Sequence, residues 1–170
     1  ELKQGKPEVM LDSCEELVRW QSEDWAKTAQ LSIEPHGPDL EKFLIAKLGG
    51  GAQDKWVISL MQPADIEGYD ELQVDFALDK PRDIALGVWS MPGYELFESF
   101  PVHVKAGTQR RVSFRLTGKI YKCRATNWAY KAEISHPENV YKLSLFVYGS
   151  SRSPIRIKNV RLVKKGGSGE

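Results

Sequence analysis

The sequence of 170 residues has few of the residue patterns that mark an enzyme or a metal-binding protein. Its two cysteines, Cys14 and Cys123, allow one disulfide bond or two free thiols and are too few for a cysteine metal cluster. The three histidines, His36, His103 and His136, share no metal-ligand spacing. No nucleophile elbow, P-loop or dinucleotide-binding fingerprint occurs. We therefore expect this chain not to be an enzyme.

Charge and hydropathy exclude two further classes of partner. The net charge is +1, so the chain has no overall attraction for nucleic acid or for an anionic membrane. No apolar run approaches the ~20 residues that a membrane-spanning helix needs. We expect neither a nucleic acid nor a membrane as partner.

The composition is that of one folded domain with flexible ends. Hydrophobic residues make up 41% and aromatic residues 10% of the chain. We expect a leader over 1–7, a single module over 8–164 and a tail over 165–170. Residues 166–170 (GGSGE) have the composition of a flexible linker, typical of an interdomain tether or a cloning remnant. The chain begins with Glu1 and shows no secretory signal, which favours a mature or excised fragment.

Short segments in which apolar and polar residues alternate recur along the chain, as in half-buried strands. These and further strand candidates without clear alternation cover residues 8–12, 29–34, 42–48, 55–61, 71–78, 82–90, 94–104, 110–116, 141–148 and 155–163. The apolar phase changes near Lys158 and Asn159, which predicts a bulge. Residues 13–16 match a capping box and predict a turn or two of helix or an irregular corner. About nine or ten strands with at most one short helix indicate a β-sandwich or a barrel.

The strand predicted at residues 82–90 suggests a binding surface. Ile84, Leu86 and Val88 would face the core, while Ala85, Gly87 and Trp89 would face the other way. Two very small residues before an indole would leave room above the sheet for a flat ligand. We hypothesise a sugar ring stacked on Trp89. The alternative is that Trp89 is covered by a loop.

Other strands place polar and aromatic side chains on the face opposite the core. If these strands share one sheet, the side chains form a single surface of rings and short polar groups. Sugars need both, because their C–H faces stack on rings and their hydroxyls need planar donors and acceptors. The candidate ligand-binding residues are Gln73, Asp75, Trp89, Tyr94, Arg111, Arg115, Trp128 and Tyr148. Each of them taken singly also has a purely structural interpretation.

Three tryptophans are assigned to packing instead. Trp56 is in phase with Ile58 and Leu60, and Trp20 and Trp25 lie near a predicted corner. The segment 117–137 has no clear period, yet it carries Tyr121, Trp128 and Tyr130, which argues against disorder. Long loops in compact domains are often functional. Together with Tyr94, this segment could close the ends of a binding groove.

Several stretches resemble a known family of modules. They are a first strand ending near Asp12, residues 68–76 (GYDELQVDF), and residues 147–149 (VYG) with 155–162 (IRIKNVRL). Over residues 8–164 the chain resembles the jelly-roll, galactose-binding-like carbohydrate-binding modules appended to secreted glycoside hydrolases. The resemblance implies a two-sheet antiparallel β-sandwich that binds glycans through aromatic residues without catalysis.

The resemblance also implies partners and a metal. The partners would be a polysaccharide or oligosaccharide and a tethered catalytic domain, in a secreted or cell-surface protein. No cofactor would be required, but many such modules hold a structural calcium ion, for which Asp12 and Glu15 are candidate ligands here. The final strand carries Lys158 where these modules often have an acidic residue.

Our interpretation is a noncatalytic glycan-binding module in which Trp89, Trp128 and Tyr148 stack on sugars. Two alternatives stay open. One is a structural or protein-interaction sandwich whose outer face is covered. The other is a small polysaccharide lyase or hydrolase, for which Arg115 and Tyr148 are the nearest candidate residues.

Overall fold

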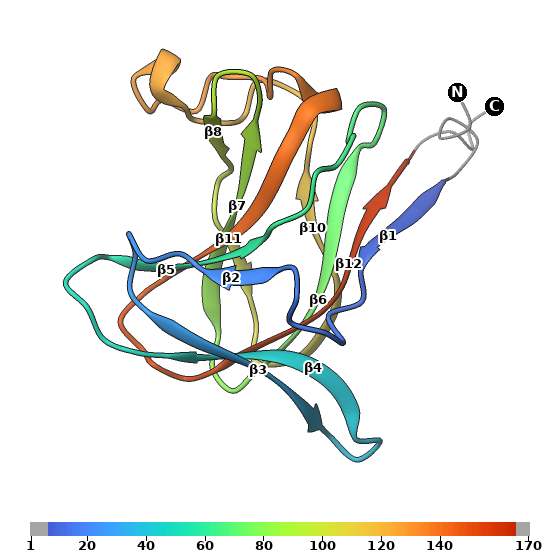
Figure 1. The fold of residues 1–170 in the computed structure, drawn as a ribbon, viewed down its shortest axis with the longest axis vertical. Helices are drawn as coiled ribbons and strands as arrows, with labels where there is room; N and C mark the ends of the chain where they lie inside the picture. The colour runs from blue at the N-terminus through green and yellow to red at the C-terminus, as the bar shows by residue number, and fades with distance from the viewer. Residues whose placement is uncertain (1–6, 166–170) are drawn as a thin grey trace.

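The computed structural model describes residues 7–165, which form two six-stranded antiparallel sheets packed face to face (Figure 1). The predicted leader and tail lie outside the described residues, apart from Pro7 and Lys165. The two-sheet β-sandwich predicted for this chain is confirmed. No helix among residues 7–165 is long and apolar enough to cross a membrane.

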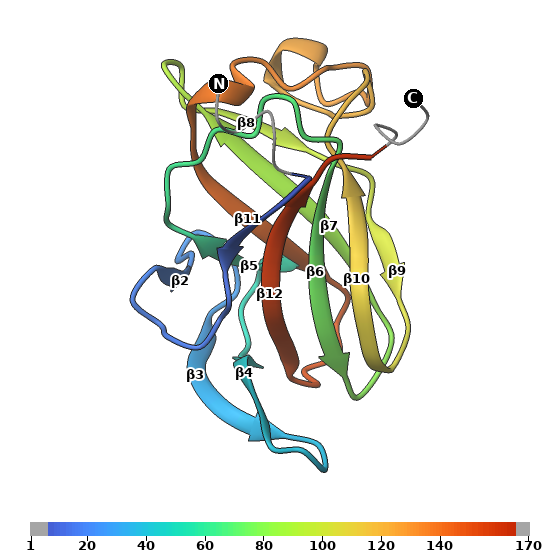
Figure 2. The same ribbon diagram turned by 90° about the vertical axis from the view of Figure 1, so that its right-hand side faces the viewer.

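The first sheet has the strand order β10-β6-β12-β4-β3, and β1 also pairs with β12. Figure 2 shows β12, β6 and β10 of this sheet in front of β11 and β7 of the second sheet. The bounds of its strands are β1 (Glu8–Asp12), β3 (Ala29–His36), β4 (Glu41–Leu48), β6 (Glu71–Leu78), β10 (Gly107–Arg115) and β12 (Ile155–Val163).

The second sheet has the order β2-β5-β11-β7-β8, and β9 also pairs with β7. Its strands are β2 (Trp20–Ser22), β5 (Lys55–Leu60), β7 (Arg82–Ser90), β8 (Glu95–Glu98), β9 (Val102–Val104) and β11 (Val140–Tyr148). Two short 3₁₀ turns, η2 (Arg124–Thr126) and η3 (Pro137–Asn139), lie in the long connection between β10 and β11. This connection lies beside β8, at the top of Figure 1.

The core lies between the sheets and is built by strict alternation. On β6, β7 and β11 every second side chain is buried in one cluster, which contains Leu72, Val74, Phe76, Ile84, Leu86, Val88, Leu143, Leu145 and Val147. Full burial of such a side chain contributes about 1.5–3 kcal/mol relative to its exposure. The inward-facing residues predicted for these strands are therefore confirmed, as is the core position of Trp56.

Some local features differ from the prediction. The strand expected over 94–104 is divided into β8 and β9, and Trp20–Ser22 forms the additional strand β2. Of the two alternatives predicted after the first strand, a short helix or an irregular corner, residues 13–19 form the irregular corner. The backbone N–H of Cys14 donates to Asp12 Oδ1 at 2.7 Å, and Cys14 has a left-handed φ of 65°. The bulge predicted near Lys158 and Asn159 is confirmed by the register of β12.

Candidate functional site

A groove of about 490 Å³ lies on the face of the second sheet that points away from the core. We call it the aromatic groove. Its lining comes from five parts of the chain that are distant in sequence. The lining residues are Trp25, Asp54, Lys55, Leu96, Glu98, Pro101, Lys122, Trp128, Tyr130, Phe146 and Tyr148.

The floor of the groove is the ring of Phe146 on β11. This ring packs with Val57, Ala85 and Ala26 in a small second cluster of buried residues. A Cβ atom on Gly87 would lie only 2.7 Å from Phe146 Cε1. The small residues of β7 therefore make room for Phe146. The prediction that they leave open space beside Trp89 for a ligand is wrong.

Two exposed tryptophans from distant segments also line the groove. Trp25 is 44% exposed and lies in the connection between β2 and β3, while Trp128 is 49% exposed and follows η2. Nearby, the rings of Phe100 and Tyr130 are stacked, with centroids 3.8 Å apart and an interplanar angle of 17°. Large apolar side chains left in contact with water beside a hollow form a surface suited to an apolar ligand face.

Trp128 is held in an unusual backbone conformation. Its φ is +62°, in the left-handed region that glycine or asparagine adopts most readily. Holding another residue there costs about 1–2 kcal/mol. The Trp128 N–H donates to the carbonyl of Cys123 at 2.9 Å, and Thr126 Oγ1 donates to the carbonyl of Ala129 at 2.7 Å. These bonds fix the turn that exposes the indole.

Charged side chains at the groove occur in pairs of opposite sign. Lys55 Nζ lies 3.0 Å from Asp54 Oδ1, and Lys122 Nζ lies 4.0 Å from Glu98 Oε1. The hydrogen bond from Lys55 lowers the pKa of Asp54. The groove therefore offers carboxylate acceptors and ammonium donors without a large net charge. Such groups suit the hydroxyls of a sugar.

Tyr148 joins the polar and aromatic parts of the groove. Its hydroxyl donates to the carboxylate of Glu98. Burial and this hydrogen bond raise the pKa of Tyr148 well above its ordinary value. The phenol therefore stays protonated at neutral pH, which makes it a hydrogen-bonding and stacking group and a poor general base.

The other predicted stacking residue of the second sheet, Trp89, is half-buried and lies outside the groove lining. Its indole N–H donates to Ser144 Oγ at 2.9 Å. The ammonium of Lys142 lies 4.4 Å from its ring centroid, and the edge of Trp25 is packed against it. The alternative reading, a tryptophan covered by the chain itself, describes Trp89 better.

The polar residues expected beside Trp89 lie on the other sheet. Gln73 and Asp75 are on β6, and Arg111 and Arg115 are on β10. The core separates the outer face of that sheet from the aromatic groove. The prediction that all these strands share one face is therefore wrong. Alternation assigns a side chain to a face of its own sheet, but it does not identify the sheet.

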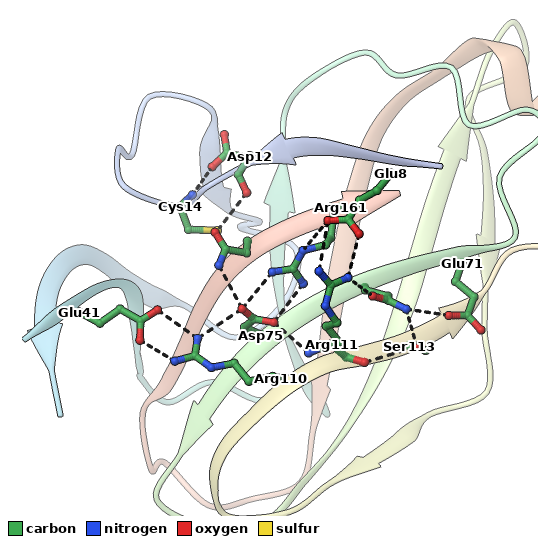
Figure 3. Close-up of polar contacts among 12 residues, drawn as sticks. Glu8, Asp12, Cys14, Glu41, Glu71, Asp75, Arg110, Arg111, Ser113 and Arg161 are labelled. Carbon is green, nitrogen blue, oxygen red and sulfur yellow. Dashed lines mark hydrogen bonds and ion pairs between the residues drawn. The ribbon is translucent and has the colours of Figure 1, made fainter. Parts of the chain in front are cut away.

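Asp75 is the centre of an ion-pair network on the outer face of the first sheet (Figure 3). Its carboxylate accepts two bonds of 3.1 Å from Arg161, one of 3.1 Å from Asn159 Nδ2, one of 3.3 Å from Arg110 and one of 2.9 Å from the Arg111 N–H. Burial raises its pKa, but these hydrogen bonds lower it more, to about 2. Every acceptor site of this carboxylate is in use.

The remaining polar candidates also have partners in this network or point to solvent. Arg111 Nη1 donates to Glu8 Oε1 and to Gln73 Oε1, both at 3.0 Å. The side chain of Arg115 is exposed, and its backbone carbonyl accepts the hydroxyl of Tyr121. The contacts of Gln73, Asp75 and Arg111 tie β1, β6 and β10 together.

The two candidate calcium ligands do not fit a metal ion. Asp12 Oδ1 accepts from the Cys14 N–H and, at 3.0 Å, from Trp20 Nε1, while its Oδ2 accepts from Arg19 at 3.3 Å. Glu15 is paired with Lys158, whose Nζ also donates to the carbonyl of Lys42 at 2.9 Å. Donor groups therefore already occupy both carboxylate oxygens of Asp12 and the Oε2 atom of Glu15. Among the residues that the structure describes, no three His, Cys, Asp or Glu side chains gather around one point.

The two cysteines are free and buried. Burial raises the pKa of the Cys14 thiol beyond its ordinary range. Of the two arrangements left open by the sequence, the structure has two separate thiols.

Sequence reasoning identified part of the groove. Trp128, Tyr130 and Tyr148 were predicted as ligand-facing and do line it. Trp25 was assigned to packing, and its ring does pack edge-on against Trp89 and Phe146, but it is also 44% exposed and lines the groove. The polar lining residues Asp54, Lys55, Glu98 and Lys122 were missed. One feature of the sequence could have indicated that Trp25 is exposed. It stands among charged residues in a stretch without strand periodicity.

Comparison with solved structures shows a fold that this chain shares. No family model and no curated protein matches the chain. A family 11 carbohydrate-binding module from Clostridium thermocellum, solved with a β-1,3-1,4-mixed-linked tetrasaccharide, is 14% identical with a TM-score of 0.63. That match covers 92% of this chain and 95% of the other. This chain has the fold of the β-sandwich carbohydrate-binding modules.

Further structures share this carbohydrate-binding-module fold. A family 28 module specific for non-crystalline cellulose is 12% identical, with a TM-score of 0.62 over 92% of this chain and 95% of that chain. An exo-β-agarase is 16% identical, with a TM-score of 0.69 over 92% of this chain but 25% of that chain. Identities this low show a common fold and leave the ligand open. The resemblance expected from the sequence is confirmed at the level of the fold.

Proposed function

We propose that this domain is a noncatalytic carbohydrate-binding module that holds a polysaccharide in the aromatic groove. The observation that carries the proposal is the groove itself, where exposed indoles and a phenol lie beside paired carboxylates and ammonium groups. The apolar face of a sugar ring would stack on Trp128 and Tyr148, and its hydroxyls would bond to Glu98, Lys55 and Lys122. The proposal needs no cofactor.

The domain would serve a catalytic domain of the same protein, outside the cell. The exo-β-agarase, in which this fold makes up a quarter of the chain, supports such an arrangement. Binding to the polysaccharide would raise the local concentration of the tethered enzyme on its substrate. Trp89, Gln73, Asp75, Arg111 and Arg115 have no place in this proposal, because their side chains lie outside the groove.

One observation favours a second candidate, a polysaccharide-cleaving enzyme. The carboxylates of Asp54 and Glu98 line the same groove, and glycoside hydrolysis uses two carboxyl groups. However, the lowered pKa of Asp54 keeps it ionised, and a general acid needs the opposite shift. An assay for reducing ends on the polysaccharides named below separates the two candidates. Release of reducing ends would favour the enzyme.

Affinity electrophoresis tests the binding function. The gels would contain mixed-linked β-1,3-1,4-glucan, xylan or agarose, and insoluble cellulose would be used in a pull-down. We expect at least one polysaccharide to retain the wild-type domain. Trp128→Asn should weaken that retention about tenfold, the equivalent of about 1.4 kcal/mol, because a stacking surface is lost.

The variant should fold as well as the wild type or better, since asparagine tolerates the left-handed backbone at position 128. Leu40→Asn is a matched control. Leu40 is 68% exposed with a φ of +54°, and it lies in the turn between β3 and β4, away from the groove. Equal retention of wild type and Trp128→Asn would show that Trp128 does not bind the glycan. Absence of retention by every polysaccharide would reject the proposed function.

A further inference from the structure

A second aromatic surface lies beside the aromatic groove. Tyr94 is 65% exposed, and its ring lies edge-on to that of Tyr141 with centroids 5.4 Å apart. We call these two residues the tyrosine shelf. Neither of them lines the groove. The exposed ring of Tyr94 and the half-buried ring of Tyr141 offer a stacking surface of the same kind that the groove offers.

Contacts between rings connect the shelf to the groove without a break. The centroids of Tyr141 and Trp89 are 6.4 Å apart, and those of Trp89 and Trp25 are 6.1 Å apart. Trp25 lines the groove and also lies 6.1 Å from Phe146, which forms the groove floor. Trp25 is thus the boundary between the two surfaces.

A bulge in β11 places Tyr141 on this face. Simple alternation would turn Tyr141 toward the core together with Leu143 and Leu145. In the ladder with β7, however, Val140 pairs with Ser90 and Lys142 pairs with Trp89, so Tyr141 is the extra residue. A bulge turns a side chain in a direction that regular pleating does not allow. Here it brings a third ring to Trp89 and Tyr94.

The backbone at Tyr94 resembles that at Trp128. Its φ is +53°, again in the region where glycine and asparagine are favoured. At both ends of this face, therefore, an exposed aromatic residue occupies a backbone conformation that disfavours it. Residues held in such conformations tend to gather at functional sites.

The segment that carries Trp25 is anchored by a buried polar network. The carboxylate of Glu23 accepts from Lys142 Nζ and, at 2.7 Å, from Ser59 Oγ. Burial alone would raise the pKa of Glu23, but these bonds lower it below its ordinary value. Ser59 in turn shares a hydrogen bond of 2.6 Å with Ser144, which accepts the Trp89 N–H. The boundary between groove and shelf is therefore fixed before any ligand arrives.

We propose that the ligand is a long polysaccharide chain whose bound segment leaves the aromatic groove, passes Trp25 and stacks on the tyrosine shelf. The inference rests on the proposed function. From Tyr141 to Tyr148, β11 rises about 23 Å at about 3.3 Å per residue. A short oligosaccharide occupies one of the two surfaces, whereas a longer chain contacts both.

Calorimetric titration with two chain lengths tests this inference. The probes are the tetrasaccharide and the octasaccharide of whichever polysaccharide retains the domain among mixed-linked β-glucan, xylan, agarose and cellulose. The wild type should bind the octasaccharide more tightly. Tyr94→Asn should weaken octasaccharide binding about fivefold and tetrasaccharide binding less than about twofold. Because asparagine suits this backbone, the variant should unfold no earlier than the wild type. Leu40→Asn again serves as control and should change neither affinity.

The outcomes distinguish this inference from the proposed function. Equal affinity of the wild type for both lengths, or an unchanged octasaccharide affinity in Tyr94→Asn, overturns the role of the shelf and leaves the groove intact. An equal loss for both lengths would place Tyr94 in the groove site and also overturns the inference. If no polysaccharide retains the wild-type domain, both proposals fail.

Discussion

Gly87, on the outer face of β7, shapes the groove because it has no side chain and leaves room for the ring of Phe146. Gly87 lies beneath Phe146 and beside Leu96. A Cβ atom at this position would lie 2.7 Å from Phe146 Cε1 and 3.2 Å from Leu96 Cδ1. The first distance is too short for any carbon contact, so the ring that forms the groove floor would have to move.

Gly87→Ala should therefore destabilise the fold, by about 1–3 kcal/mol, as overpacking of a tight site does. Urea unfolding measures the loss. Gly93→Ala is the matched control, because its Cβ would meet only Glu95 Cγ at an ordinary 3.5 Å. If both variants unfold at the urea concentration of the wild type, Phe146 is not tightly seated on β7. Loss of glycan retention by Gly87→Ala would follow from the displaced floor.

At the level of the strands, the sequence predicted much of the fold and only part of the site. Alternation identified the inward residues of β6, β7 and β11 and the bulge near Asn159, because each is a local property of one strand. Which strands pair is decided by contacts distant in sequence. Gln73 and Trp89 both face away from the core, yet they lie on opposite sides of the molecule. The bulge that turns Tyr141 outward leaves one mark in the sequence, since the core residue Val140 is out of phase with Leu143 and Leu145, but the predicted strand began only at Tyr141.

The first sheet is joined across its strands by Asp75 on β6. This carboxylate is almost fully buried and binds the guanidinium of Arg161 on β12 through two oxygens. Its other bonds come from Asn159 and from residues of β10. A buried carboxylate with this many donors stays ionised to low pH, and breaking such a pair leaves an uncompensated buried charge. The network around Asp75 thus stabilises the fold. The prediction from the sequence had given Asp75 a ligand-binding role instead.

The stability of the domain should depend on pH through Asp75. Its pKa is about 2 in the fold and about 3.9 in an unfolded chain, so the carboxylate stabilises the fold above about pH 4. This contribution, about 2.5 kcal/mol, is lost as the pH falls from 4 toward 2. Urea unfolding at pH 5, 4, 3 and 2 measures it.

Asp75→Asn should be less stable at pH 5 by about 3–5 kcal/mol and should lose less stability on acidification than the wild type. Asp79→Asn is the control, because Asp79 is half-exposed in its pair with Arg156 and such a pair is worth less than about 1 kcal/mol. Parallel pH profiles for the wild type and Asp75→Asn would contradict the role assigned to this carboxylate.

For the whole molecule, the distribution of charge bears on the ligand. The chain has a net charge of +1, and each lysine in the aromatic groove lies near a carboxylate. On the outer face of the first sheet, Arg110 and Arg111 are likewise bound to Glu41 and Glu8, while the side chain of Arg115 is exposed. Neither face presents a field that would attract a polyanion. The proposed ligand is accordingly an uncharged polysaccharide.

Glycan binding should then depend little on salt. We expect the dissociation constant of the retained polysaccharide to change less than about twofold between 50 and 500 mM NaCl, because no counterions are released when a neutral chain binds. A protein that neutralises six to ten phosphates loses about 10³–10⁵ in affinity between 50 and 200 mM salt. Calorimetric titrations between 50 and 500 mM NaCl measure how the dissociation constant depends on salt. A steep loss of affinity would mean that Lys55 and Lys122 leave their carboxylates to bind an anionic chain. Lys122→Met would then make the affinity less dependent on salt, while Trp128→Asn would leave that dependence unchanged.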